Sequence, residues 1–468
     1  MTLPDAPTDP SATQGVTPVT RRRADIGQPG SRRAEAAYVA LAALVGLLAG
    51  AVGSAFHRVI DMLAAWPDML RRVMDGPAFP VAYSLMTMLV TVGVVALVRR
   101  IAPEAAGSGV QEIEGAMEGL RTVRGARVLP VKFLGGAAAI GSGLVLGREG
   151  PTIHIGAALA ALLSRSPRLH ETERRGLLAA GAAAGLACAF NAPIAAILFV
   201  IEETHRQFPY TYRTYMGVIA AAFCATVVTE VIGGTAPDLT VIVPTAPLAT
   251  LPLFLLMGCI LGAVGVLLNA AILSAVRFAA AAQARVPYAY PACVGLAVGV
   301  LLASVPQAVT GGEGLIVDIL HRQPAIGVLL ALALARFCTT VASYSTGVPG
   351  GIFAPILALA VCIGLAFGAA VSFFWPQPDA LPAAFAIAAM GGLFTASVRA
   401  PVVGVVLTLE LTGSYALALP LIATCLAANL AARALGGRPI YEELLDRTLA
   451  MAGIVPRKPA ADRDTGLA

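Results

Sequence analysis

Charged side chains are scarce in this sequence. Of its 468 residues, 13% are Asp, Glu, Lys or Arg, whereas 57% are hydrophobic and the mean hydropathy is +0.80. Soluble domains carry about 25% charged residues, which they need to cover their surface. The composition therefore excludes an ordinary soluble globular protein.

Cysteine and histidine are also few, and neither is grouped. The seven cysteines lie in apolar runs without a CxxC pair, and the five histidines form no HxxxH pair. We therefore expect no disulfide framework, metal site or cofactor, and interpret the cysteines as small buried hydrophobic residues. The net charge of +5 arises mostly in loops, so no nucleic-acid partner is expected.

Long apolar runs are abundant instead, and several reach the ~20 residues that a helix needs to cross a bilayer. Others are broken by glycine or proline, of which the chain has 48 and 32. Broken helices leave backbone groups that lipid cannot satisfy, so they are tolerated only inside protein or around a water-filled cavity. The sequence predicts an all-α polytopic membrane protein with an ion or substrate pathway.

The polar ends of the chain predict its orientation. Residues 1–35 are polar, contain clustered arginines and lack the apolar segment of a signal peptide, so we expect a disordered basic tail. Arginines before a first span place that end in the cytoplasm. We expect a transmembrane domain over 36–440 and a short cytoplasmic helix and tail over 441–468. Both termini would lie on the cytoplasmic side of the inner (plasma) membrane.

An internal repeat divides the apolar region. The segment NAPIAAILFVIEE (191–203) is similar to RAPVVGVVLTLEL (399–411), and GREGPTIHIGA (147–157) shares G-x-x-x-P with GIFAPILALAV (351–361). The two offsets, 208 and 204 positions, are nearly equal. They predict halves of about 37–235 and 249–436. Repeats of this kind are common in transporters, whose binding sites lie near the midplane where broken helices meet.

Three glycine-rich breaks each precede an apolar run. They are GSGVQE (107–112), GREGP (147–151) and GVPGGIFAP (347–355). A helix that starts at such a break presents unpaired N–H groups and the positive end of its dipole, which together attract anions. Three such ends that meet at the midplane would bind an anion without a full positive charge. The sequence therefore predicts an anion site.

These motifs resemble those of the CLC family of chloride channels and chloride/proton antiporters. GSGVQE is similar to the family's GSGIPE, GREGP is its motif unchanged, and GGIFAP matches its GxFxP. FNAPIAAILFVIEE and GGRPIY follow in the family's order, so the resemblance covers about 37–450. It implies a CLC-type fold of about eighteen helices in two inverted repeats with broken helices at midplane. It also implies a homodimer with one ion pathway per subunit.

The resemblance assigns roles to individual residues. Glu149 would be the external gate and proton acceptor, and Glu203 the internal proton-transfer residue. Chloride, bound as substrate, would be held by the hydroxyls of Ser108 and Tyr441 and by the backbone N–H groups of Ile352 and Phe353. The chain departs from the family at Val110-Gln111, where the family usually has Ile-Pro, and this departure bears on the position of Ser108.

Simpler structural roles exist for the two acids. Glu149 could be an ion-pair partner of Arg148, although an ionisable residue inside a membrane is by default a functional candidate. Glu202 has a repeat counterpart in Glu410, which indicates an architectural role. Glu203 corresponds to Leu411, so its acid is peculiar to one half, which favours a functional role.

Together these residues predict a secondary active transporter that exchanges chloride for protons, not an enzyme. The alternative within the same fold is a passive, proton-gated chloride channel. The acid at Glu203 favours exchange, because channels of the family generally lack it. An intramembrane hydrolase is a third hypothesis, but the chain has no GxSxG or HExxH motif.

Overall fold

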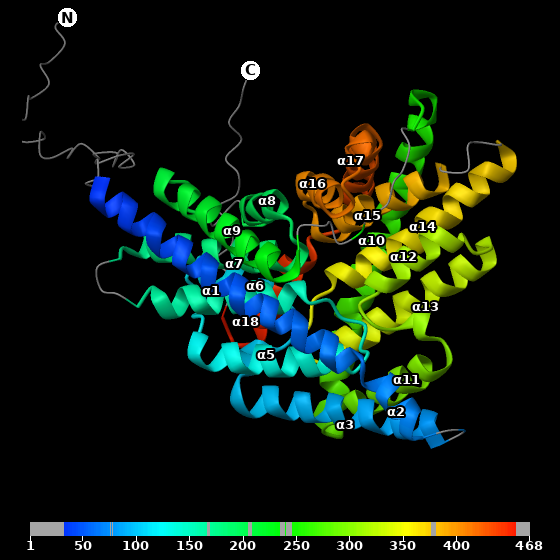
Figure 1. The fold of residues 1–468 in the computed structure, drawn as a ribbon, viewed down its shortest axis with the longest axis horizontal. Coiled ribbons are helices and arrows are strands. Elements are labelled where there is room, and N and C mark those ends of the chain that lie inside the picture. The colour runs from blue at the N-terminus through cyan, green and yellow to red at the C-terminus, as the bar shows by residue number, and fades with distance from the viewer. Residues whose placement is uncertain are drawn as a thin grey trace, which may run out of the picture.

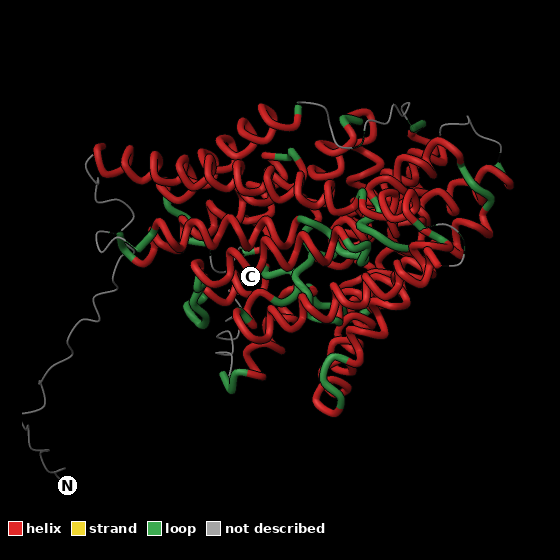
Figure 2. The backbone as a smooth tube through the Cα atoms, turned by 60° about the horizontal axis from the view of Figure 1, so that its bottom comes forward, coloured by secondary structure: helices red, strands yellow, loops and turns green. Residues whose placement is uncertain are grey.

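The computed structural model describes residues 32–454, except for 75, 77, 166–168, 205–207, 235–238, 240–245 and 376–380. These residues form eighteen α-helices and four short 3-10 helices, with isolated bridges in place of strands (Figures 1 and 2). The predicted all-α class with about eighteen helices is confirmed. The expected tail over 1–35 lies outside the described residues, apart from its last four, which begin α1. Residues 455–468 of the predicted C-terminal segment also lie outside them.

The helices fall into two series along the chain. The first is α1 (Arg32–Ala64), α2 (Trp66–Val73), α3 (Ala78–Ile101), α4 (Val110–Met117), α5 (Gly125–Gly141), α6 (Glu149–Leu163), α7 (Glu171–Phe190), α8 (Pro193–Glu203) and α9 (Tyr212–Gly233). The second is α10 (Leu251–Arg285), α11 (Ala289–Ser304), α12 (Glu313–Arg322), α13 (Ile326–Ser345), α14 (Phe353–Phe374), α15 (Leu381–Val398), α16 (Pro401–Thr412), α17 (Ala418–Ala434) and α18 (Ile440–Met451).

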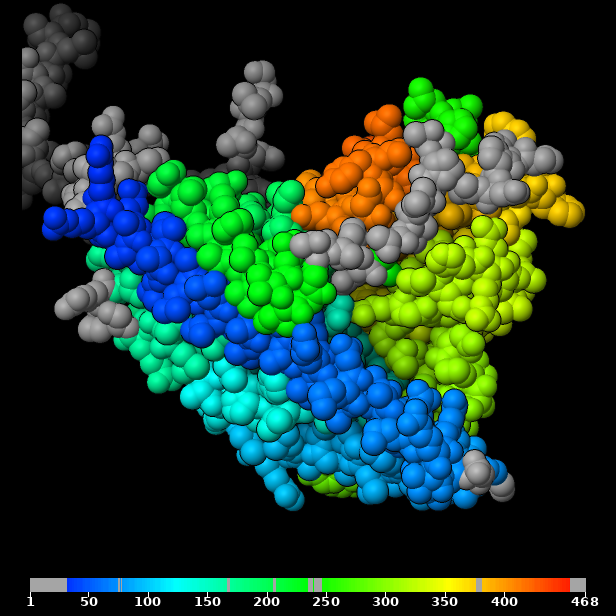
Figure 3. Space-filling view, in the orientation of Figure 1, coloured from blue at the N-terminus to red at the C-terminus, as the bar shows by residue number. Residues whose placement is uncertain are grey.

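Eight helical segments are long and apolar enough to cross a membrane. Several carry large apolar side chains that are exposed on the outside of the protein, such as Leu89 on α3, Phe223 on α9 and Leu267 on α10. Helices α1 and α9 lie side by side on one such face (Figure 3). Exposed apolar surface of this extent requires lipid or another protein as its neighbour, so the chain is a multi-pass membrane protein.

The two series repeat one another element by element. Apart from α2 and α18, each helix from α1 to α9 has a counterpart between α10 and α17, so the repeat extends well beyond the two segments visible in the sequence. The counterparts α3 and α11 pack together across the two halves, as do α8 and α16 (Figure 1).

The contact between α8 and α16 shows how the halves are related. The Glu202 carboxylate at the end of α8 accepts hydrogen bonds from the Val402 and Val403 amides, at 3.2 and 2.9 Å, at the start of α16. The Glu410 carboxylate at the end of α16 does the same at the start of α8, at 3.1 and 2.7 Å. Each helix therefore ends where its counterpart begins, so the two run antiparallel and the repeat is inverted. The architectural role expected for Glu202 is confirmed.

The interior is built from small residues. Every residue of α15 is buried, and α14 and α7 are buried along most of their length. Helices α6 and α7 approach so closely that a Cβ added to Gly156 would lie 2.0 Å from the Gly181 carbonyl oxygen. Without a hydrophobic drive between helices in lipid, such close packing of small residues holds the bundle together.

Candidate functional site

The three glycine-rich breaks meet in the interior, where loops cross the middle of the helical body (Figure 2). The Gly107 amide donates to Val348 at 3.1 Å, and the Gly350 amide donates back to Gly107 at 3.0 Å. Gly147 and Gly351 exchange two backbone hydrogen bonds of 2.8 Å each. The breaks at 107, 147 and 347 are therefore joined into one backbone unit, as their predicted shared function requires.

Each break leads directly into a helix. Helix α4 begins after Gly109, whose φ of 92° lies in the left-handed region that favours glycine. Helix α6 begins at Glu149 and α14 at Phe353, with Pro151 and Pro355 in their first turns. The first amides of a helix have no partner within it, so the N–H groups of Ile352 and Phe353 are available at this point.

The residues expected to bind chloride are all buried at this meeting point. Ser108, Ile352 and Tyr441 have no exposed surface, and Phe353 has 1%. The hydroxyls of Ser108 and Tyr441 are close enough to interact, although neither makes a hydrogen bond of good geometry with a described residue. The Tyr441 ring lies 6.0 Å from that of Phe353. Buried hydroxyls without well-formed hydrogen bonds are uncommon and costly.

Glu149 lies at the same place. Its side chain is fully buried, and its carboxylate lies near the backbone N–H groups of Glu149 and Ala354, although neither oxygen makes a hydrogen bond of good geometry with a described residue. A Cβ added to Gly351 would lie 3.0 Å from one of these oxygens, and a Cβ added to Gly150 would lie 2.6 Å from the Ser108 hydroxyl. The carboxylate therefore occupies the space between the starts of α6 and α14, beside the chloride ligands.

Arg148 does not pair with Glu149. Its guanidinium Nε lies 3.3 Å from a Glu313 carboxylate oxygen at the start of α12. Glu149 forms no ion pair with a described residue. The structural alternative for Glu149, a partner of Arg148, is therefore wrong, because Glu313 takes that place.

Glu202 and Glu203 are neighbours in the chain but have different surroundings. Glu202 stabilises the start of α16, as described above. The Glu203 side chain instead lies beside Glu114 of α4, and the two carboxyl groups are close enough to interact. A hydrogen bond between two carboxyl groups requires a proton on one of them.

Two further residues of the site gave little signal in the sequence. Lys132 on α5 is fully buried, and its ammonium group donates to the carbonyls of Gly107 and Ser108, at 2.5 and 3.0 Å. It fixes the break before α4 and brings a positive charge close to Ser108. The second such residue is Glu114. Its importance could not be seen in the sequence, because it depends on contact with Glu203, which is distant along the chain. A lone lysine in an apolar run was the one usable signal for Lys132.

Gln111, where the chain departs from the family motif, faces a cavity on the α18 side. This cavity has a volume of about 390 Å³, and its lining includes Gly107, Gln111, Arg121, Tyr344 and Arg447. The Gln111 side chain is 7% exposed, and its amide forms no hydrogen bond with a described residue. Helix α4 begins one residue before Gln111, at Val110. The absence of the family's proline therefore does not disrupt the start of α4, and Ser108 keeps its place just before that helix.

A smaller cavity lies on the opposite side of the buried site. It has a volume of about 150 Å³, and its lining includes Arg148, Phe190, Glu313, Ala354 and Leu357. The 390 Å³ cavity borders Gly107 and is called the inner cavity below, and the 150 Å³ cavity borders the residues next to Glu149 and is called the outer cavity. The buried groups of Ser108, Tyr441 and Glu149 thus lie between two openings, as in an occluded ion site.

Comparison with known proteins identifies the family to which the chain belongs. The model of the family described as voltage gated chloride channel matches residues 89–433. The chain belongs to this family. It is 46% identical over 418 residues to a Vibrio cholerae protein named H(+)/Cl(-) exchange transporter ClcA, covering 87% of this chain and 89% of that protein. A protein of the same name from Salmonella agona is 44% identical over 427 residues, covering 88% and 89%.

Solved structures of the voltage-gated chloride channel family share the fold. A slow cyanobacterial Cl−/H+ antiporter superposes with a TM-score of 0.84 at 32% identity, covering 89% of this chain and 99% of that one. A eukaryotic CLC transporter gives 0.77 at 22% identity, covering 89% and 74%, a likeness that concerns the fold alone. The recognition of the family from three short motifs and a repeat is confirmed.

Proposed function

We propose that this protein is a secondary active transporter that exchanges chloride for protons. The observation that carries the proposal is the fully buried Glu149 carboxylate beside the buried hydroxyls of Ser108 and Tyr441, none of which makes a hydrogen bond of good geometry with a described residue. A carboxylate and a chloride ion compete for the same space at the helix starts. Protonation removes the charge of Glu149, so its side chain leaves and chloride enters. The names of the bacterial relatives support the same activity.

Chloride binding follows from the chemistry of the partners. The two hydroxyls and the N–H groups of Ile352 and Phe353 are all donors, and they supply partial charges only. Such a site holds an anion firmly enough to select it and weakly enough to release it, which transport requires. Lys132 keeps its charge on the backbone carbonyls before α4, so it adds to the potential without binding the ion.

Proton transfer on the inner side is assigned to Glu203. Its carboxyl lies close to that of Glu114, so a proton can pass between the two, and α4 links that pair to the break that contains Ser108. Glu203 has no acidic counterpart in the second half, where Leu411 takes its position. The repeat is therefore asymmetric at this residue, as expected of a residue that carries protons and not chloride. The external gate at Glu149 and this inner pair form the two ends of the proposed proton route.

We further propose that the protein is a homodimer in the inner membrane, with both termini in the cytoplasm and one pathway per subunit. Exposed apolar side chains on α8, α9, α16 and α17 form a continuous surface for a second copy; they include Ile194, Phe223, Val402, Ile422 and Leu426. No cofactor enters the mechanism, since chloride and protons are both substrates.

The decisive experiment is reconstitution into liposomes. A chloride gradient imposed across the membrane should drive protons uphill in a coupled exchanger, and a pH electrode measures this directly. Chloride flux without proton pumping would refute exchange and establish the passive, proton-gated channel instead.

A further inference from the structure

A cavity of about 550 Å³ lies outside the proposed ion site. It is bounded by the second half of α1, the break before α6, the junction of α7 and α8, and the end of α9. None of the six residues assigned to chloride or proton transfer lines it. Its volume falls in the range of about 300–1,000 Å³ that is typical of small-molecule sites.

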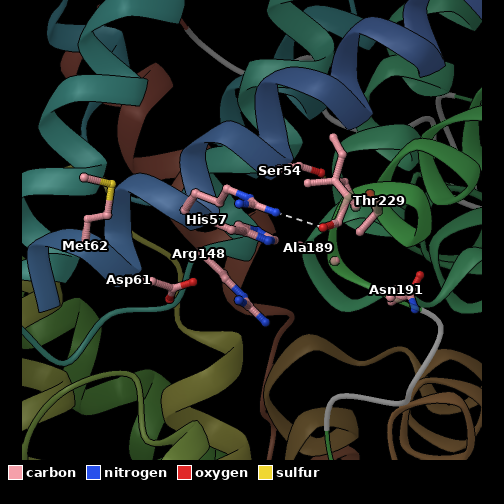
Figure 4. A pocket seen from close by; sticks show the side chains of 13 residues that line it. Ser54, His57, Asp61, Met62, Arg148, Ala189, Asn191 and Thr229 are labelled. Atoms are coloured by element: carbon pink, nitrogen blue, oxygen red, sulfur yellow. Dashed lines mark hydrogen bonds between the residues drawn. The ribbon is translucent and has the colours of Figure 1, made fainter. Parts of the chain in front are cut away.

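Basic groups dominate the lining of this cavity. His57 and Arg148 point into the same space, with Asp61 on one side and Asn191 on the other (Figure 4). Arg58 also lines it, and its guanidinium is held in place by a 2.9 Å hydrogen bond to the Ile232 carbonyl. Asp61 is the one acid among the lining residues, so two arginines face a single carboxylate. The cavity attracts negative charge.

His57 indicates that the cavity has a polar occupant. Its Nε2 atom is buried and forms no hydrogen bond with a described residue. The side-chain oxygen of Asn191 is also buried without a partner, and an amide that is turned over would present its donors instead. Buried polar atoms without partners cost free energy, so a ligand that hydrogen-bonds here would be stabilised.

We propose that this cavity binds a small soluble oxyanion, a phosphate or carboxylate group, from the Glu149 side of the membrane. The planar guanidinium of arginine forms paired hydrogen bonds with such groups, which a spherical ion cannot match. Arg58 contributes these donors, His57 donates from Nε2, and Arg148 adds charge from the opposite wall. The site is separate from the chloride ligands and takes a larger ligand.

Arg148 connects this site with transport, and this step rests on the proposed function. The same side chain also lines the 150 Å³ outer cavity, pairs with Glu313, and precedes Glu149 in the chain. An oxyanion beside Arg148 neutralises part of the charge that draws chloride to the outer opening. Its binding therefore slows chloride entry from that side, which makes the site inhibitory.

Binding is tested first without lipid. Inorganic phosphate is titrated by calorimetry into the detergent-solubilised protein at constant chloride and ionic strength. Saturable binding is expected, with an affinity at least tenfold weaker in Arg58→Gln and in His57→Phe. Arg72→Gln on α2 removes the same charge outside the cavity and should leave the phosphate affinity unchanged. Absence of saturable heat, or equal affinity in all four proteins, overturns the proposal.

Transport gives the second readout. Phosphate on the outside of liposomes should lower chloride flux in the wild type and in Arg72→Gln, and have at least tenfold lower potency in Arg58→Gln. The measure is the ratio of flux with and without phosphate, so basal differences between variants cancel. Flux insensitive to bound phosphate overturns the inhibitory role while leaving exchange intact. If chloride flux were inhibited only in vesicles that contain phosphatidylglycerol, and not in phosphatidylcholine vesicles, the ligand would be a lipid headgroup. That result would overturn the proposal of a soluble oxyanion.

Discussion

Glu149 combines two properties that rarely occur together, a fully buried carboxylate and no hydrogen bond of good geometry with a described residue, although the backbone N–H groups of Glu149 and Ala354 lie near it. Replacing it by glutamine keeps its shape but fixes it in the neutral form. We expect Glu149→Gln to conduct chloride without proton coupling and to lose most of the dependence of flux on external pH. Chloride and proton fluxes measured together in liposomes check this. Proton pumping against a gradient by Glu149→Gln would refute the gating role.

The two hydroxyls make a quantitative prediction. Loss of a hydrogen bond to a charged group costs roughly 1.5–3 kcal/mol, which is about a tenfold to hundredfold loss of affinity. Tyr441→Phe keeps the ring packed against Phe353, so it should weaken chloride binding through the hydroxyl alone. Ser108→Ala should weaken it by a similar factor. Calorimetry with Tyr415→Phe, at an exposed position, provides the control, and unchanged affinity in both site variants would exclude direct ligation.

The adjacent acids at 202 and 203 allow a matched comparison. Glu203→Gln disrupts the carboxyl pair with Glu114, so proton movement should stop while chloride still flows. Glu202→Gln should leave proton coupling largely intact, because its carboxylate binds the amides of α16. Simultaneous proton and chloride fluxes distinguish the two. If Glu203→Gln abolished chloride flux as well, its role would be structural.

At the scale of elements, the reciprocal caps between α8 and α16 make a prediction about stability. Each cap is a charged hydrogen-bond acceptor for two amides, and removing that charge from Glu410 should cost about 1–3 kcal/mol. Glu202→Gln should cost a similar amount, because the two caps are related by the repeat. Thermal unfolding in detergent measures both. A large loss from one variant with none from the other would contradict the symmetric arrangement.

Substitution of Gly150, in the first turn of α6, tests how closely this helix packs against Ser108. A Cβ added to Gly150 would lie 2.6 Å from the Ser108 hydroxyl, whereas one added to Gly314 on α12 would meet nothing within 4 Å. Gly150→Ala should therefore displace Ser108 and lower chloride affinity at least tenfold. Gly314→Ala should leave it unchanged. Calorimetric titration with chloride compares the two.

The sequence predicted the elements better than their assembly. Pro151 and Pro355 marked the starts of α6 and α14 because proline is tolerated in the first turn of a helix. The reciprocal bonds between Gly147 and Gly351 could not be predicted from residue type, because backbone hydrogen bonds carry no sequence signature. The sequence offered its chain neighbour Glu149 only as an alternative partner for Arg148 and gave no sign of Glu313, with which Arg148 pairs and which is distant in sequence. Pairs of this kind are created by the fold alone.

At the scale of the whole molecule, the ion site lies where the two halves meet, with a cavity on either side. One chain therefore supplies a complete pathway, and a dimer would contain two. Native mass spectrometry in detergent should give twice the 47.7 kDa of one chain. A fully active species with the mass of a single chain would contradict the proposed homodimer.

Helix α15 has a consequence for how the protein is made. It is eighteen residues long, rich in alanine and glycine, and buried along its whole length by neighbours that include α10, α14 and α17. The helix is apolar enough to enter a bilayer by itself, but its small side chains gain most of their packing from neighbouring helices. Because α17 is synthesised after α15, the packing of α15 is complete only once α17 has emerged.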